Sequence, residues 1–196
     1  MKNNFPKGSF AAWYGEDLTG QTYEGDLDCS DKKLISLFGC PSIVTGHFYC
    51  SHNQLTSLEG APEKVLGFFD CSSNKLTSLE GAPKEVGEDF YCSSNQLTSL
   101  EGTPKEVRGH FDCSDNKLTS LEGAPEKVGK GFYCNDNKLV TLEGSPEKIE
   151  ESFNCSYNQL ISLKGAPKEV GRYFYCSNNQ LTSLKGISEV KGEIYS

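Results

Sequence analysis

The cysteines of this chain recur at one constant interval, and that interval constrains the fold more than any other feature of the sequence. Eight of the nine cysteines, from Cys29 to Cys176, each follow the previous one after 21 residues. Leucine stands five and eight positions after each of them, glycine ten positions after, and asparagine three positions after seven of them. A fixed period of this length predicts a repeat architecture, in which each turn buries its apolar side against its neighbours.

The idealised unit, F-Y-C-S-S-N-Q-L-T-S-L-E-G-A-P-K-E-V-G-E-D, resembles the leucine-rich repeat, with Phe and Cys in two of the leucine places. The resemblance covers residues 24–196, and the N-Q-L-T-S-L run is most similar to the short repeats of bacterial effector proteins and of small bacterial and phage repeat proteins. The sequence differs from those effectors in having L-E-G-A-P where they usually carry L-P-x-L-P. The resemblance implies an all-β-rich solenoid, a horseshoe with a parallel sheet on its concave side.

The residue types of the unit agree with this fold. Phe and Cys two positions apart point to the same side of a strand, so both are predicted to face inward. The asparagines are predicted to bond to backbone groups of neighbouring turns and to be structural. Gly-Ala-Pro after the second leucine excludes a helix, which predicts an extended or polyproline-like convex side. We expect an N-terminal cap at 1–23, eight repeats at 24–186 and a C-terminal cap at 187–196.

The cysteine column allows three interpretations. Adjacent thiols could form disulfides or bind a metal, but the chain has no C-x-x-C pair and no histidine in phase with the column. Free cysteine also behaves as a small buried hydrophobic residue. The sequence therefore favours structural thiols, with no metal site and no cofactor.

The residue just before each cysteine alternates between an acidic or amide residue and tyrosine along the repeats: Asp28, Tyr49, Asp70, Tyr91, Asp112, Tyr133, Asn154, Tyr175. This position points outward, onto the predicted concave face. One interpretation is inheritance from an ancestral double unit of 42 residues, with no selected role. The other is a binding stripe of tyrosine anchors separated by carboxylates. On the second interpretation Tyr91 and Tyr133 are the main anchors, and their rings pack on nothing internal.

The three histidines also fall on the predicted concave side, but too far apart to bind one metal ion. His110 is expected beside Asp89 and on the same face as Asp112, which would favour its protonated form. No hydroxyl nucleophile lies within reach of His110, and the sequence has no phosphate-binding loop. We therefore predict no enzyme and no catalytic residue, with catalysis at His110 as the weakest alternative.

The sequence predicts a protein-binding module that captures a partner on its concave Tyr/Asp face. The resemblance allows a more specific version, a phage- or bacterium-encoded inhibitor of a host protein. The alternative is binding of a small ligand or glycan by the aromatic stripe. Asp115 and Asp136 are predicted neighbours that would attract a basic partner, hold calcium weakly or simply be solvated. The candidate partner-binding residues are His47, Tyr49, His52, Phe68, Asp70, Asp89, Tyr91, His110, Asp112, Asp115, Tyr133, Asp136, Tyr157, Tyr173 and Tyr175.

The net charge of −8 argues against nucleic acid and against an anionic membrane surface. It favours a partner protein with a basic or mixed surface. The N-terminus has no continuous apolar run of the kind found in secretory signals, so we expect a cytoplasmic protein.

Overall fold

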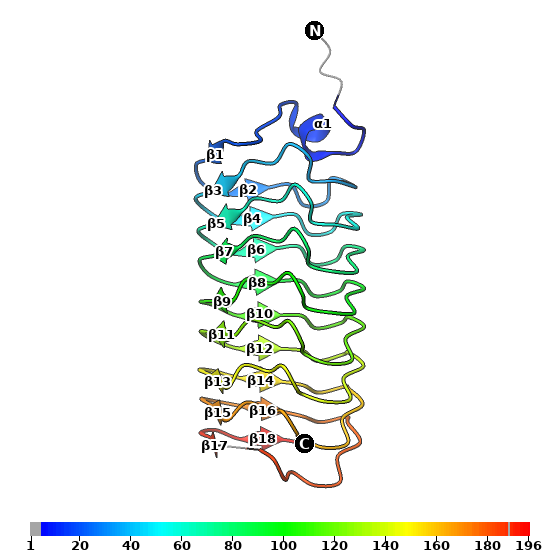
Figure 1. Ribbon diagram of the computed structural model, residues 1–196, viewed down its shortest axis with the longest axis vertical. Coiled ribbons are helices and arrows are strands. Elements are labelled where there is room, and N and C mark those ends of the chain that lie inside the picture. Colours follow the sequence, from blue (N-terminus) through cyan, green and yellow to red (C-terminus); the bar gives the residue numbers. More distant parts are fainter. Residues whose placement is uncertain (1–4, 188) are drawn as a thin grey trace.

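Two parallel β-sheets run the length of the molecule, and each turn of the solenoid contributes one short strand to each sheet (Figure 1). The computed structural model describes residues 5–187 and 189–196. Sheet 1 contains β1 (Thr22–Tyr23), β3 (Ile43–Val44), β5 (Lys64–Val65), β7 (Glu85–Val86), β9 (Glu106–Val107), β11 (Lys127–Val128), β13 (Lys148–Ile149), β15 (Glu169–Val170) and β17 (Glu189–Val190). Sheet 2 contains β2 (Leu27–Asp28), β4 (Phe48–Tyr49), β6 (Phe69–Asp70), β8 (Phe90–Tyr91), β10 (Phe111–Asp112), β12 (Phe132–Tyr133), β14 (Phe153–Asn154), β16 (Phe174–Tyr175) and β18 (Ile194–Tyr195).

Sheet 2 is the sheet that the sequence predicts, and its inward residues form continuous ladders. The phenylalanines from Phe48 to Phe174 stack with ring centroids 5.2–5.8 Å apart between successive turns. All nine cysteines are free and buried. The two leucines of each turn complete the core, and all but the last pair are fully buried. The structure therefore confirms an all-β-rich parallel solenoid with buried structural thiols.

Sheet 1 lies where the sequence predicts an extended or polyproline-like convex side. These segments are extended, and two residues of each also pair with the neighbouring turns. The N–H of Leu66, for example, donates to the carbonyl of Val44 at 3.0 Å, and that of Gly87 to the carbonyl of Val65 at 3.0 Å. Because all turns but the shortened last one have the same length, the backbone groups of successive turns come into register and form a ladder.

The asparagine column ties the turns together, as predicted. The Asn95 Nδ2 donates to the carbonyls of Cys71, Cys92 and Ser93 at 3.1–3.2 Å. The same pattern recurs at the other six asparagines of the column. The amides therefore satisfy buried backbone groups in two successive turns, which is a structural role.

A short helix, α1 (Phe10–Tyr14), covers the first turn. The N–H groups of Phe10 and Ala11 donate to the carbonyls of Ser36 and Phe38 at 3.0 Å, and the Phe10 ring is fully buried. Both sheets extend into the segments predicted as caps, because β1 pairs with β3 and β18 pairs with β16. Within the described part of the chain, no helix is long and apolar enough to cross a membrane.

Candidate functional site

The outer surface of sheet 2 carries the alternating residues that precede the cysteines, and we call it the Tyr/Asp face. The strand register places them side by side in one row. The order along the row is Asp28, Tyr49, Asp70, Tyr91, Asp112, Tyr133, Asn154, Tyr175 and Tyr195. The predicted stripe of tyrosines separated by carboxylates is therefore a geometric feature of the molecule.

The carboxylates of the row are fixed in one orientation by the serine two residues later. The Oδ1 atoms of Asp28, Asp70 and Asp112 accept the backbone N–H of that serine at 2.8–2.9 Å. Asn154 accepts the N–H of Ser156 in the same way, at 3.0 Å. Among the described residues, no group donates to the Oδ2 atoms of the three aspartates. Each carboxylate therefore presents one oxygen that a partner could bind.

The tyrosines of the row lean the opposite way, toward the residue two positions earlier. The Tyr91 hydroxyl donates to Asp89 Oδ2 at 2.7 Å. The Tyr133 ring lies over Gly131, where a Cβ would stand 2.7 Å from the hydroxyl oxygen. Two further rings lie 6.0–6.1 Å from the ring two positions earlier, Tyr49 beside His47 and Tyr175 beside Tyr173. The Tyr195 hydroxyl donates to the carboxylate of Glu193. The alternation thus produces two parallel tracks, which we call the carboxylate track and the tyrosine track.

The tyrosine rings are not free of internal contacts, which corrects the expectation made for Tyr91 and Tyr133. Besides its bond to Asp89, the Tyr91 ring meets the Phe68 ring edge-on at 6.3 Å. Burial raises the pKa of the Tyr91 phenol, and the neighbouring carboxylate of Asp89 raises it further. Burial also raises the pKa of Tyr133. Both rings are therefore held in place before any partner binds.

The residues three positions before the cysteines line the tyrosine track. The imidazole of His47 stacks on the Phe68 ring at 3.6 Å between centroids. The Asp89 Oδ1 accepts the backbone N–H of His110 at 2.8 Å, and the Lys130 Nζ lies 3.9 Å from the same oxygen. Burial opposes ionisation of Asp89, but the hydrogen bonds from His110 and Tyr91 hold its pKa below the usual value.

The imidazoles of His110 and His47 bond to the backbone of the next turn. The Nδ1 of His110 accepts the backbone N–H of Gly131 at 3.1 Å, and His47 Nδ1 accepts that of Phe68 at 3.0 Å. The two histidines complete the backbone bonding of the next turn.

The position of Asp112 in the row affects the pKa of its carboxyl group. It lies between Tyr91 and Tyr133 near the middle of the row. Burial raises the pKa of its carboxyl group and the nearby Asp70 adds to the effect, while the bonds from Ser114 oppose it. A cationic group brought to this carboxylate would replace lost hydration, so Asp112 is the most favourable position for a basic side chain.

Four candidate residues do not lie on the sheet. His52, Asp115, Asp136 and Tyr157 occupy the turn that follows sheet 2, with left-handed φ values of 52–55°. The Asp115 carboxylate accepts from the Ser94 hydroxyl at 2.9 Å and that of Asp136 from the Asn135 amide at 2.7 Å. Within the described ranges, no three His, Cys, Asp or Glu side chains come together as metal ligands.

Several members of the face are absent from the candidate residues predicted from the sequence, and three of them affect its geometry. Asp28 begins the carboxylate track and has the same Asp-Cys-Ser signal as its equivalents. Tyr195 stacks on Tyr175 at 4.8 Å between centroids, and continuing the period through the shortened last unit would have found it. Gly131 makes room for the Tyr133 ring. The only sign of this in the sequence is that the equivalent positions of the other turns carry bulkier residues.

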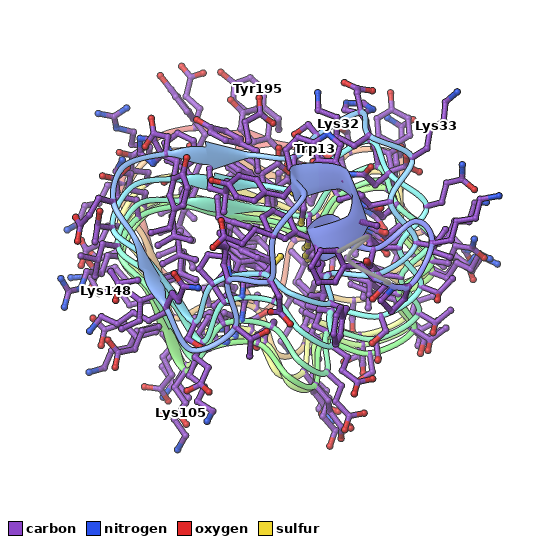
Figure 2. The ribbon with its side chains drawn as sticks, turned by 90° about the horizontal axis from the view of Figure 1, so that it is seen from above. Trp13, Lys32, Lys33, Lys105, Lys148 and Tyr195 are labelled. Atoms are coloured by element: carbon purple, nitrogen blue, oxygen red, sulfur yellow. The ribbon has the colours of Figure 1, made fainter. Side chains whose placement is uncertain are left out.

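The Tyr/Asp face is acidic. The positions three before, one before and one after the cysteines contain no Lys or Arg in any turn. The carboxylates at these positions are Asp26, Asp28, Asp70, Asp89 and Asp112, and Glu193 holds the equivalent position before Ser196 in the last unit. Seen along the solenoid axis, Tyr195 points to a different side from Lys105 and Lys148, which belong to the side of sheet 1 (Figure 2). These carboxylates favour a basic partner on the Tyr/Asp face.

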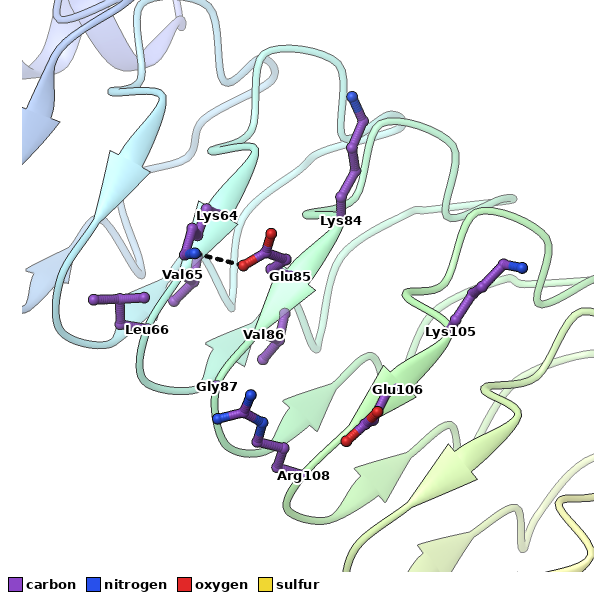
Figure 3. A pocket seen from close by; sticks show the side chains of 10 residues that line it. All are labelled: Lys64, Val65, Leu66, Lys84, Glu85, Val86, Gly87, Lys105, Glu106 and Arg108. Atoms are coloured by element: carbon purple, nitrogen blue, oxygen red, sulfur yellow. Dashed lines mark ion pairs between the residues drawn. The ribbon is translucent and has the colours of Figure 1, made fainter.

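Two hollows on the protein surface lie over sheet 1 instead. A shallow cavity of about 480 Å³ crosses the outer face of β5, β7 and β9, with Leu66 and Arg108 on opposite sides (Figure 3). Lys64 and Glu85 form an ion pair of 2.5 Å across its rim. Similar lysine–glutamate pairs link successive turns along sheet 1, which agrees with a solvated surface.

Comparison with solved structures supports the fold. The chain is similar to YopM from Yersinia enterocolitica WA-314, with a TM-score of 0.57 and 21% sequence identity over 86% of this chain. It has the fold of a leucine-rich repeat solenoid. The match spans 41% of the YopM chain. No family model matches the sequence, and no curated protein is similar to it.

Proposed function

We propose that this solenoid is a non-enzymatic module that captures a partner protein with a basic surface on its Tyr/Asp face. Repeat solenoids present extended binding surfaces, which supports a protein-binding scaffold in general. The proposal depends on one observation above all: the fixed carboxylates of Asp28, Asp70 and Asp112 each keep an oxygen to which no described residue donates. They alternate with tyrosine rings, the residue type enriched at binding hot spots.

The charges of the face also support a basic partner. Asp28, Asp70 and Asp112 form no ion pair with another described residue, so they can attract Lys and Arg during encounter and repel acidic surfaces, which gives both rate and specificity. The tyrosines then supply apolar contact area with a polar end. We place this capture in the cytoplasm, where free thiols remain reduced. A bound partner has its basic surface covered, and this is how the inhibitory role expected from the resemblance would arise.

The test uses the immobilised parent chain to capture proteins from a bacterial lysate, followed by titration of the captured partner. We expect a basic partner, and we expect the double variant Tyr91→Ala, Tyr133→Ala to lose about 2 kcal/mol or more of binding free energy. The matched control is Lys84→Ala, Lys127→Ala on sheet 1, which should bind like the parent. A control more damaging than the tyrosine variant would contradict the proposal.

Because the two rings have internal contacts, the tyrosine variant needs a folding check. We expect each truncation to cost about 1 kcal/mol of unfolding free energy, too little to unfold the solenoid. Near-parent thermal unfolding would assign the lost binding to the face itself. Titration with soluble cell-wall glycan fragments addresses the alternative ligand, and saturable binding of these with no protein captured would favour that alternative.

A further inference from the structure

The two tracks of the Tyr/Asp face have the same spacing. The carboxylates of Asp28, Asp70 and Asp112 belong to β2, β6 and β10, which are separated by single intervening strands. Neighbouring strands lie about 4.8 Å apart, so these carboxylates repeat about every 9.6 Å. Tyr49, Tyr91 and Tyr133 repeat at the same distance, offset by one turn. A partner that uses the whole face needs a matching repeat along its own length.

Among regular backbones, the polyproline II helix matches this spacing best. It has three residues per turn and rises about 3.1 Å per residue, so every third side chain points the same way after about 9.3 Å. Over the two intervals between Asp28 and Asp112 the mismatch is about 0.6 Å. An α-helix returns to the same side after seven residues and about 10.5 Å, which gives a mismatch of about 1.8 Å. In a β-strand, side chains return to the same side only after an even number of residues, and no such repeat matches the spacing of the carboxylates.

We propose that the Tyr/Asp face binds an extended polyproline II segment of a partner protein that carries arginine at every third residue. The arginines reach the free Oδ2 atoms of the carboxylate track, and prolines between them lie against the tyrosine track. This inference rests on the proposed function and specifies its partner. Charge complementarity supports it, because the three outward positions of sheet 2 contain carboxylates and no Lys or Arg.

The arrangement of the side chains favours this ligand in two further respects. The serine bonds hold the Asp70 and Asp112 carboxylates in one orientation, so the face loses little conformational freedom when it binds. A polyproline II segment is also ordered before binding, and aromatic grooves recognise such segments in other domains. Arginine suits the site better than lysine, because its planar group can bond to a carboxylate and stack on a tyrosine ring together.

The order of residues along the row also predicts where on the face the recognition of arginine side chains ends. At the fourth place of the carboxylate track Asn154 accepts the same serine bond but carries no charge. The next two members of the row are tyrosines, Tyr175 and Tyr195, whose rings stack on each other. The ligand therefore needs three arginines at the carboxylates, and its remaining length meets an amide and an aromatic surface.

The decisive experiment compares fluorescein-labelled peptides by anisotropy with the full chain at about 150 mM salt, where weak long-range attraction is screened. The peptides are four repeats of Arg-Pro-Pro, four repeats of Arg-Pro-Pro-Pro and four repeats of Glu-Pro-Pro. The first two have equal charge and differ in spacing. We expect the three-residue repeat to bind about tenfold or more tighter than the four-residue repeat, and the glutamate peptide to show no binding. Equal affinity of the two arginine peptides, or no binding of either, would overturn the inference.

A pair of variants locates the site. Asp112→Asn should weaken binding of the Arg-Pro-Pro peptide about fivefold or more, and the Asn154 example shows that an amide keeps the serine bond. Asp115→Asn removes the same charge three residues later, in a left-handed turn that asparagine adopts readily, and should change affinity less than twofold. Equal losses in the two variants would indicate unspecific attraction and contradict the inference. The proposed function would still stand if a folded basic partner lost binding to the tyrosine variant.

Discussion

The side-chain oxygen of Asn95 accepts a hydrogen bond from the backbone N–H of Leu76, 3.0 Å away in the preceding turn. Its amide group donates to two carbonyls of its own turn and one of the turn before. Asn95 is buried, so water cannot replace these bonds. The column of which it is part joins every turn to the next through side-chain bonds as well as through the two sheets.

Asn95→Ala should therefore lower the free energy of unfolding by about 3 kcal/mol, because a buried N–H and several carbonyls lose their partner. Urea denaturation measures the effect. The control is Asn135→Ala, which removes an exposed amide bonded to Asp136 and should cost less than about 0.5 kcal/mol. Equal losses in the two variants would show that the buried amide has no special role.

Gly81→Ala should destabilise the solenoid more than the same substitution at a glycine with open space around it. Gly81 has a φ of 87°, and a Cβ there would lie 2.8 Å from the carbonyl carbon of Leu58 in the preceding turn. Gly20 has a φ of 81° but no atom within 4 Å of a Cβ. Gly20→Ala should cost about 1 kcal/mol from backbone strain alone, and Gly81→Ala at least about 2 kcal/mol more. Similar thermal unfolding of the two variants would contradict the close approach of the turns.

The buried thiols should make the fold sensitive to alkali. Burial raises the pKa of Cys29 to about 12 and that of the mid-stack thiols well above the usual value. Below about pH 8.5 the thiols are protonated in both states, and above it the unfolded chain ionises first. Stability should therefore fall as pH rises, by about 1.4 kcal/mol per pH unit for each thiol. Urea midpoints under reducing conditions at pH 8 and pH 10 test this, and equal midpoints would show that the thiols are accessible.

The N-terminal helix should be required for a stable first turn. Phe10→Ala removes a fully buried ring and should cost about 3–5 kcal/mol. Trp13→Ala, in the same helix, removes a ring that is 38% exposed and should cost much less. Hydrogen exchange of residues 22–50 would report local opening in the Phe10 variant. Protection equal to the parent in this region would mean that the first turn is stable without its cover.

The parts of the fold that follow from alternation along a strand could be predicted from the sequence. Phe and Cys face inward and the Tyr/Asp row faces outward because strand geometry leaves no other arrangement once the period is known. Sheet 1 was harder to predict, because its strands are only two residues long and show no apolar alternation, as at Val107, whose neighbours are Glu106 and Arg108. Its strands form because turns of equal length bring their backbones into register.

The details of the face depend on atoms that sequence patterns do not place. The opposite lean of Asp112 and Tyr91 is set by Ser114 on one side and Asp89 on the other. The turn that contains Asp115 is left-handed in every repeat, although the residue there varies among Asp, His, Ser, Tyr and Asn. Because the residue type varies, the sequence does not reveal this common backbone conformation. These residues were therefore predicted to lie on the sheet.

The asparagine column has a mechanical consequence. In the described part of the chain its bonds, like the ladders of both sheets, connect only successive turns, so distant turns do not hold each other together under tension. Pulled from its C-terminus, the molecule should unravel one turn at a time, each release adding about 70 Å of extended chain. The intact turns above each break would keep their own amide bonds. A force recording should thus show a series of nearly equal steps rather than one rupture, and the molecule would lengthen gradually under load like a spring that uncoils.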